Sequence, residues 1–337
     1  MEKKNVTIKA IAKELGVSIS TVSRALKNNP RIGPHTRRRV MKVAERLNYI
    51  PNPIAVNLQR SRTNMLGLVV PTLEQDFFSH IVSGVEQVAS ENGFHIIISQ
   101  SNDSMETEKA IIQSYIAAKV DGILVSMAAD THDYSHFVKV QSLGIPLVFY
   151  DRVPRNFPSH KVRCEILNGV KEAITFLYNG NKRKIALLNG PSNQQVSDDR
   201  LNGYLEAIKD LSLSTSPEYI KTTDLSREDN YRKMSEFIAM GENRPEAIVC
   251  FNDYVALDAI KTCQAHSIVP NQDICFVSFA NTRHAQYIEN KPLASVEQFP
   301  VMLGSESARL LLEDIQTSEK LKFREIFVPT QLIVYPG

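Results

Sequence analysis

From residue 65 onward, short apolar runs alternate with stretches of helical periodicity, and this alternation constrains the fold more than any other feature. It predicts parallel sheets with helices on both faces. We expect eight buried strands, at Leu66–Val70, Ile96–Ser99, Gly122–Val125, Leu147–Tyr150, Ile185–Asn189, Ile248–Phe251, Cys275–Ser278 and Leu293–Val296. Eight strands favour an α/β body with two doubly wound lobes over a single lobe.

The charge of the chain is distributed unevenly. Residues 1–62 carry a net charge of +11, and the remaining residues carry −9. A basic segment next to an acidic one is typical of a nucleic-acid-binding head on a separate body. A merely solvated charged surface is the alternative, and the size of the asymmetry disfavours it.

Three short amphipathic helices are predicted in residues 1–50, at Ile8–Leu15, Ile19–Leu26 and about His35–Leu47. Thr7 and Ser18 precede the first two helices and are good N-caps. Gly16 follows the first helix and can adopt the left-handed conformation that ends it. A three-residue turn between two short helices predicts a helix-turn-helix.

The second of these helices is expected to enter a DNA major groove and to expose Ile19, Ser20, Ser23 and Arg24. An arginine such as Arg24 can donate to both major-groove acceptors of guanine. Phosphate oxygens suit the hydroxyls of Thr7, Ser18, Ser20 and Thr21. The alternative is a three-helix protein-interaction bundle, which the basic surplus disfavours.

The sequence TIKAIAKELGVSISTVSRALKN, followed by TRRRV and LNYIPNPIA, resembles the head and hinge of the lactose-repressor (LacI/GalR) family. The resemblance implies that Ile19, Ser20 and Arg24 read bases and that Asn28 also contacts DNA. One departure is that Gly33-Pro34-His35 replaces the usual serine cap, so we expect a weaker start of the third helix.

The resemblance also covers a hinge at residues 51–64. In the family this segment forms a short helix only when DNA and a second subunit order it, and a leucine then opens a base step in the minor groove. Leu58 stands at that position, with Ala55 packing beneath it and Gln59 following it. Ordinary core packing is the alternative role for Leu58.

The body resembles periplasmic sugar-binding proteins and the effector domain of the same family, through pieces such as LVVP, DRLNGY, FND and PLASV. In such folds ligands bind at the carboxyl ends of the strands. The resemblance implies that Arg200 grips a small-molecule effector between the lobes. The complete set of expected effector contacts is Asp76, Phe77, Phe78, Asp151, Arg152, Arg200, Asn252, Asp253, Phe279 and Asn281.

Ala280 departs from the family pattern, because a carboxylate that clasps sugar hydroxyls usually stands there. A pocket that keeps Arg152 and Arg200 without this acid is more electropositive. This favours an anionic effector, such as a sugar acid or phosphosugar, to which Arg283 could add a contact. The alternative, left open, is that Asn281 takes over hydroxyl recognition of a neutral sugar.

Several other classes of protein are disfavoured by what the sequence lacks. It contains no phosphate-binding glycine motif, no nucleophile elbow and no grouped Cys or His with zinc spacing, so we expect neither an enzyme nor a cofactor. The four cysteines are expected to be buried thiols. No run is long and apolar enough for a membrane span, and no secretion signal is visible, which predicts a cytoplasmic protein.

These observations predict a sequence-specific DNA-binding transcription regulator, most simply a repressor, that responds to a sugar or sugar derivative. Its domains are expected at residues 1–50 (helix-turn-helix), 51–64 (hinge) and 65–337 (effector binding and dimerisation). The lobes are expected to comprise roughly 65–162 with 293–325, and 163–292 with 326–337. A homodimer would match a near-palindromic operator in double-stranded DNA.

The hinge assignment generates the first testable prediction. Replacing Leu58 by alanine removes the side chain that would open the base step, so Leu58→Ala should weaken operator affinity without unfolding the body. A DNA titration and a bending assay measure this. Unchanged affinity together with unchanged operator bending would contradict the assignment.

Overall fold

The computed structural model describes residues 7–47, 49, 62–317 and 322–336. The chain forms two compact units, a head (Met1–Thr63) and a body (Asn64–Gly337). The predicted hinge residues Ala55, Leu58 and Gln59 lie outside the described residues, so their roles stay predictions.

The head contains the three predicted helices, α1 (Ile8–Leu15), α2 (Ile19–Leu26) and α3 (Pro34–Arg46). One small apolar core joins them, made of Ile11, Ala12, Val22, Ala25, Val40 and Ala44. Helices of this length are marginal in isolation, so burial of these side chains against one another is what stabilises them.

Local chemistry sets the turn between α1 and α2. Gly16 is left-handed, with φ 65°, and the Ser18 hydroxyl accepts a hydrogen bond from the Thr21 backbone N–H at 3.1 Å. Thr7 occupies the predicted N-cap position of α1, although its side chain makes no capping hydrogen bond. The weak start predicted for α3 is confirmed, since Gly33 offers no side chain and Pro34 fills the first turn.

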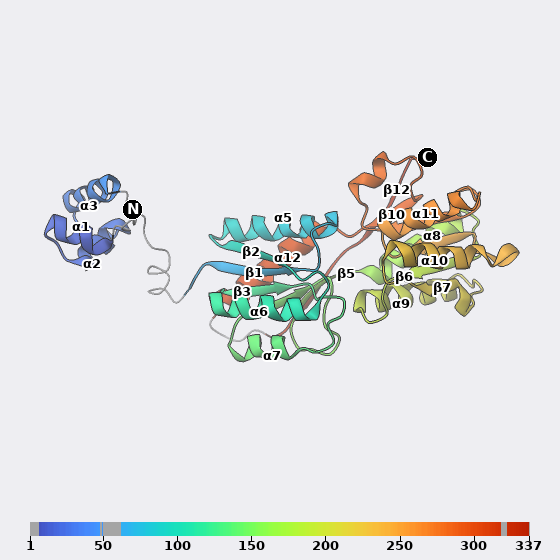
Figure 1. The fold of residues 1–337 in the computed structure, drawn as a ribbon, viewed down its shortest axis with the longest axis horizontal. Coiled ribbons are helices and arrows are strands. Elements are labelled where there is room, and N and C mark those ends of the chain that lie inside the picture. Colours follow the sequence, from blue (N-terminus) through green and yellow to red (C-terminus); the bar gives the residue numbers. More distant parts are fainter. Residues whose placement is uncertain (1–6, 48, 50–61, 318–321, 337) are drawn as a thin grey trace. The chain divides into compact units, whose positions relative to one another are not determined.

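The body contains two six-stranded sheets, one in each lobe (Figure 1). The first sheet has the order β11-β5-β4-β3-β1-β2, with strands β1 (Met65–Val70), β2 (His95–Gln100), β3 (Gly122–Val125), β4 (Leu147–Tyr150), β5 (His160–Cys164) and β11 (Glu325–Val328). The second has the order β12-β10-β9-β8-β6-β7, with strands β6 (Ile185–Asn189), β7 (Ile220–Thr222), β8 (Ala247–Cys250), β9 (Cys275–Phe279), β10 (Ala294–Glu297) and β12 (Gln331–Val334). All pairs are parallel except β10 with β12, which confirms the predicted fold class.

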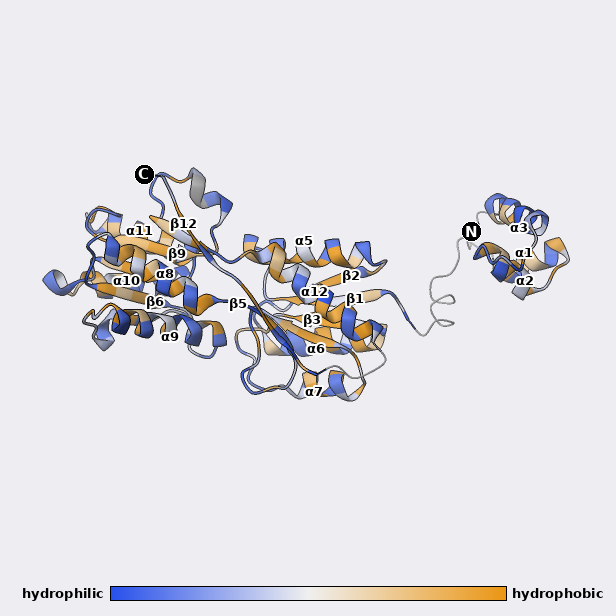
Figure 2. Ribbon diagram, turned by 180° about the vertical axis from the view of Figure 1, so that it is seen from behind, coloured by the Kyte–Doolittle hydropathy of each residue, from blue (hydrophilic) through white to orange (hydrophobic). Residues whose placement is uncertain are grey.

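Helices cover both sheets and pack in pairs, α5 with α12 and α6 with α7 in the first lobe, and α8 with α9 and α10 with α11 in the second. Their bounds are α5 (Asp76–Glu91), α6 (Met105–Ala118), α7 (Ser135–Ser142), α8 (Ile166–Asn179), α9 (Gln195–Asp210), α10 (Arg227–Ile238), α11 (Asp253–Ala265) and α12 (Pro300–Gln316). The described residues also form the 3-10 helices η1 (Pro217–Tyr219), η2 (Gly241–Asn243) and η3 (Arg283–Tyr287). Hydrophobic strands lie between helices with hydrophilic outer sides (Figure 2). Among the described helices, none has the length and hydropathy of a membrane span.

The chain crosses between the lobes three times, after β5, after β10 and after β11. Two predicted lobe boundaries are therefore wrong. Residues 293–297 were expected in the first lobe, but β10 pairs with β9 in the second sheet. Residues 326–328 were expected in the second lobe, but β11 pairs with β5 in the first. The apolar pattern of a strand predicts that the strand is buried but not which strand lies beside it. The sequence therefore could not assign β10 and β11 to a lobe.

The sequence patterns did not predict four of the strands, β5, β7, β11 and β12. β5 alternates buried with half-buried residues, and β7, β11 and β12 are exposed or half-buried over most of their length. β7, β11 and β12 are also edge strands, which need no continuous apolar run because one side faces no neighbouring strand.

The closest helix crossing joins α5 to α12 at two glycines. A Cβ on Gly84 would collide with the Val301 carbonyl oxygen, and a Cβ on Gly304 would collide with that of Ile81. The Ser305 hydroxyl donates to the Gly84 carbonyl across the same crossing, at 3.3 Å. The two backbones therefore touch directly, and any side chain at these positions forces them apart.

We expect Gly304→Ala to lower the free energy of unfolding of the body by about 1–3 kcal/mol, because the added methyl overpacks the crossing. Chemical denaturation measures this change. Ser90→Ala, on the exposed side of α5, is the control and should stay within about 0.5 kcal/mol of the parent. Equal stability of both variants would contradict this account of the crossing.

Candidate functional site

The outward side of α2 carries the residues predicted to read bases. Ile19 is 46% exposed although it is a large apolar residue, and Ser20 and Arg24 are exposed as well. Ser23 is half-buried, and Val22 and Ala25 of the same helix belong to the core. The helix thus separates a packing side from a free side that bears an apolar, a hydroxyl and a guanidinium group.

Three hydroxyls gather where α2 begins. Ser18 Oγ lies 2.8 Å from both Ser20 Oγ and Thr21 Oγ1. Hydroxyls at a helix N-terminus, where backbone N–H groups are free and the dipole is positive, suit a phosphate oxygen. Thr7 lies exposed before α1, and Asn28 lies exposed after α2 with φ 53°.

Some of the basic residues of the head have structural partners. Arg37 donates to the carbonyls of Asn29 and Ile32 and so holds the turn before α3. Arg46 forms an ion pair with Glu14 of α1. These two cations are committed to the fold.

In the body, six of the expected effector contacts line a single cavity at the carboxyl ends of the strands of both lobes. They are Phe77, Phe78, Asp151, Arg152, Arg200 and Asn252. The cavity measures about 50 Å³ and is completed by Gln75, Val196, Phe251, Ala280 and Gln298. The sequence had marked Ala280 as a departure from the family pattern, whereas nothing in the residue types of Gln75, Val196, Phe251 and Gln298 marked them as ligand contacts.

Arg200 is the central group of this cavity. Its side chain comes from α9, is 2% exposed, and lies with its guanidinium carbon 4.1 Å from the ring centre of Phe251 and 4.6 Å from that of Phe279. One nitrogen donates to the Val196 carbonyl at 3.1 Å. Burial lowers the pKa of Arg200 to about 10, and the nearby Asp151 carboxylate raises it against that effect. Arg200 is therefore a cation at neutral pH.

Arg152 and Asp151 face Arg200 from the end of β4. The Arg152 guanidinium forms an ion pair with Asp103 and lies 5.7 Å from the ring centre of Phe78. Burial raises the pKa of the Asp151 carboxyl, although Arg152 and Arg200 pull it down. Since Asp103 neutralises Arg152, the cleft is less electropositive than the sequence suggested.

Several buried polar side-chain atoms lack a partner. The described residues contain seven such atoms, and five of them lie in the segments that follow β3 or β6. They are Ser126 Oγ, both polar atoms of Gln194, Ser197 Oγ and Arg200 Nε. Buried polar atoms normally have partners, and Arg200 Nε is the one among these five whose residue lines the cavity.

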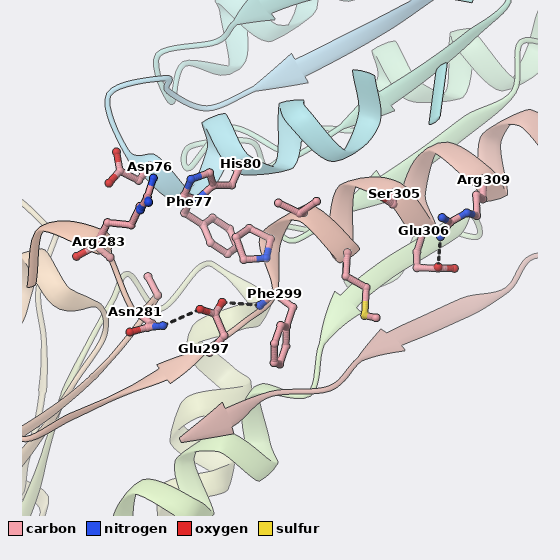
Figure 3. A pocket seen from close by; sticks show the side chains of 15 residues that line it. Asp76, Phe77, His80, Asn281, Arg283, Glu297, Phe299, Ser305, Glu306 and Arg309 are labelled. Carbon is pink, nitrogen blue, oxygen red and sulfur yellow. Dashed lines mark hydrogen bonds and ion pairs between the residues drawn. The ribbon is translucent and has the colours of Figure 1, made fainter. Parts of the chain in front are cut away.

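Asp76 and Asn281 line a different and larger cavity of about 570 Å³, between the start of α5, the start of α12 and residues 280–283 (Figure 3). Phe77 and Ala280 line both cavities, so the two spaces meet there. Asn281 donates to Glu297 at 2.8 Å and accepts from the Tyr335 hydroxyl at 2.8 Å. Its amide is therefore occupied, which weakens the idea that Asn281 replaces the missing acid.

Asp253 and Phe279 stand behind the cleft. The Asp253 carboxylate accepts hydrogen bonds from Ser278 Oγ, from Ser295 Oγ at 2.7 Å and from the Thr282 backbone N–H at 2.6 Å. Burial raises the pKa of this carboxyl, and these hydrogen bonds pull it down. Phe279 is fully buried under Arg200. Both residues hold the strand ends in place.

Asp198 and Asp199 immediately precede Arg200. Both lie within α9, and both pair with arginines of the first lobe: Asp198 with Arg155 at 2.6 Å, and Asp199 with Arg163. The two acids therefore join the lobes on either side of the cleft.

Comparison with known proteins identifies the family. Residues 63–334 match the family described as periplasmic binding proteins and sugar binding domain of the LacI family, and residues 7–52 match bacterial regulatory proteins of the lacI family. The chain belongs to the LacI family. As a LacI-family protein it is a DNA-binding transcription regulator whose body binds an effector, as predicted.

Similar LacI-family proteins extend over the whole chain. The repressor CytR of Escherichia coli K12 is 27% identical over 92% of this chain and 90% of its own length. The regulator DegA of Bacillus subtilis is 29% identical, over 97% and 96%. The lac repressor dimer bound to operator and the anti-inducer ONPF shares the fold, with a TM-score of 0.83 at 24% identity over 98% of both chains. The regulator CelR in complex with cellobiose gives 0.73 at 25% identity, again over 98% of both.

The hydrogen bonds of Asp253 generate a prediction that distinguishes a structural role of this residue from a role in effector binding. Asp253→Ala removes the acceptor of the Ser278 hydroxyl and of the Thr282 N–H and leaves the Ser295 hydroxyl with the Asn281 N–H, so we expect the free energy of unfolding to fall by about 3 kcal/mol. The exposed acid Asp210, replaced by alanine, is the control. If the Asp253→Ala protein were as stable as the parent, the structural role assigned to Asp253 would be contradicted.

Proposed function

We propose that this LacI-family regulator binds a sugar or sugar derivative between its lobes through Arg200 and controls operator binding by it. The observation that carries the proposal is the buried Arg200 guanidinium, which lines the cavity, stacks on two aromatic rings and leaves Nε without a partner among the described residues. Sugar hydroxyls supply both donors and acceptors, and sugar rings stack on aromatic walls such as Phe77 and Phe78. CelR and the lac repressor were solved with cellobiose and ONPF, which supports the same class of effector here.

Effector binding requires the lobes to move apart. A cavity of about 50 Å³ is close to the space of one or two water molecules, each of which occupies about 30 Å³ in the liquid. A sugar ring is larger, so it binds an arrangement with a wider cleft. An effector shifts the equilibrium only through such a difference in affinity between two arrangements. Three crossing segments carry this motion.

These observations allow either an anionic or a neutral effector, and they weaken both hypotheses relative to what the sequence suggested. Arg152 is neutralised by Asp103, which weakens the anionic hypothesis, whereas Asn281 is occupied, which weakens the neutral one. Since Phe77 and Ala280 line both the cleft and the larger cavity, we infer that the site accepts a ligand longer than one sugar ring.

For DNA recognition we propose that Ile19, Ser20 and Arg24 read bases while Ser18 and Thr21 hold phosphates. Two heads on a homodimer would match a near-palindromic operator. The edge strand β2 supports a dimer, because Ile96, Ile97 and Ile98 follow one another in it and Ile98 is 40% exposed. No described strand pairs with its outer side. We infer that the protein acts in the cytoplasm, where its DNA lies, and performs no catalysis.

The decisive experiment measures operator binding by fluorescence anisotropy, on a site selected from random DNA, with a panel of neutral and acidic sugars. We expect at least one sugar to change the affinity of the parent protein. Arg200→Gln should bind the operator equally well and lose this response. Arg24→Ala should lose about 1–3 kcal/mol of operator affinity. A panel without effect, or an Arg200→Gln protein that responds normally, would contradict the proposal.

A further inference from the structure

The larger cavity beside the cleft has the size of a ligand site, whereas the cavity at Arg200 does not. Sites for small molecules usually measure about 300–1,000 Å³. The larger cavity measures about 570 Å³, and the cavity at Arg200 measures about 50 Å³. With the lobes arranged as in the structure, the larger cavity can receive a ring-sized group, while the cleft receives one only after the lobes have moved apart.

Two residues form the boundary between these cavities. Phe77 at the start of α5 and Ala280 after β9 line both of them. Both side chains are half-buried, so a ligand can reach them. The Phe77 ring packs edge-on against that of Phe78, with 5.4 Å between the ring centres, and Phe78 lines the cleft. An aromatic wall therefore leads from the cleft into the larger cavity, and the second lobe borders it with a single methyl group.

The turn that carries Ala280 is strained and firmly held. Ala280 has φ 91° and Asn281 has φ 46°, although residues other than glycine rarely adopt positive φ. The Ala280 N–H donates to the Val296 carbonyl at 3.0 Å, and the Asn281 N–H donates to Ser295 Oγ at 2.9 Å. Backbone strain persists only where the surrounding contacts over-determine it, and it is concentrated at sites that hold ligands. The direction of the Ala280 side chain is therefore fixed, and its size determines how wide the boundary is.

The charges of the larger cavity favour a neutral hydroxylated group over an anion. Three carboxylates line it, those of Asp76, Glu297 and Glu306, together with the guanidinium groups of Arg283 and Arg309 (Figure 3). Glu306 and Arg309 pair with each other at 2.5 Å. An anion would meet more negative than positive charge, whereas hydroxyl groups can donate to carboxylate oxygens.

We propose that the effector has two rings and that Ala280 determines this specificity. One ring binds at Arg200 in the widened cleft. The second ring, neutral and hydroxylated, lies in the larger cavity against the apolar side chains of Phe299, Pro300 and Met302. A disaccharide or a related two-ring glycoside has this form. The inference rests on the proposed function, because it names the class of ligand for the same site.

The difference in size between the cavities gives the expected order of affinities. A ligand that binds only the open arrangement loses affinity in proportion to how rarely that arrangement is populated. This loss is the same for one ring and for two rings at Arg200. A two-ring ligand also gains contacts in the larger cavity, which needs no opening to receive them. Single rings are therefore expected to bind weakly.

The test is isothermal titration calorimetry of the full chain with disaccharides and their constituent monosaccharides. The disaccharides are cellobiose, maltose, lactose, mannobiose and xylobiose. We expect at least one of them to bind about tenfold more tightly than its constituents, a difference that a small apolar contact can produce. Equal affinity of disaccharides and monosaccharides would overturn this inference and leave the proposed function intact. Absence of binding by every sugar would overturn both.

Variants at the boundary test the role of Ala280. Asparagine adds bulk without charge and tolerates positive φ, so Ala280→Asn should remove the preference for the disaccharide while the monosaccharide still binds. Ala280→Gly removes the methyl group and the strain, so it should keep the preference. A preference retained in Ala280→Asn would overturn the proposed role.

A change confined to the larger cavity locates the second ring and decides if Ala280→Asn does not fold. Met302 lines the larger cavity and not the cleft, so Met302→Ala should weaken the disaccharide and leave the monosaccharide unchanged. Val138→Ala, an equally exposed apolar residue of α7, is the control and should alter neither affinity. Unchanged disaccharide affinity in Met302→Ala, or an equal loss for both sugars, would place the second ring elsewhere and overturn the inference.

Discussion

The buried guanidinium of Arg200 is the interaction on which the arrangement of the cleft depends. A charge removed from water costs several kcal/mol unless its surroundings compensate it. Here the compensation comes from the rings of Phe251 and Phe279 and from the Asp151 carboxylate. These three groups stand at the ends of β8, β9 and β4, which belong to different lobes. One cation therefore fixes the strand ends of both sheets relative to each other.

The turn of α9 that carries Arg200 also carries the ion pairs between the lobes. Asp198 and Asp199 precede Arg200 directly and bind Arg155 and Arg163 of the first lobe. Any ligand that displaces Arg200 therefore acts on the same turn that holds the lobes together. This coupling needs no long pathway, because Arg200, which lines the cleft, is adjacent in the chain to Asp198 and Asp199, which pair with the first lobe. The three crossing segments then limit the motion to a change of angle or separation.

Sequence reasoning succeeded where local chemistry decides the structure. Gly16 and Ser18 could be predicted because a left-handed residue and a cap leave recognisable residue types. The strand ends around Arg200 could be predicted from the family resemblance. Ser126, Gln194 and Ser197 could not, because their importance lies in being buried without a partner, which depends on how the strand ends meet. The same holds for Asn281, whose amide is occupied by Glu297 and Tyr335, groups distant in sequence.

The glycine crossing of α5 with α12 has a consequence for the order in which the protein can fold. These helices lie side by side (Figure 1), yet more than 200 residues separate Gly84 from Gly304. During synthesis the head can fold early, because its contacts are local. Once the chain has been made as far as β10, the second sheet lacks only its edge strand β12, whereas the first lobe lacks both α12 and β11. Until they emerge, the apolar side of α5, with Ile81 and Val85, stays uncovered. The lobe that is begun first stays incomplete until α12 and β11 have been made, so interrupted synthesis exposes its core.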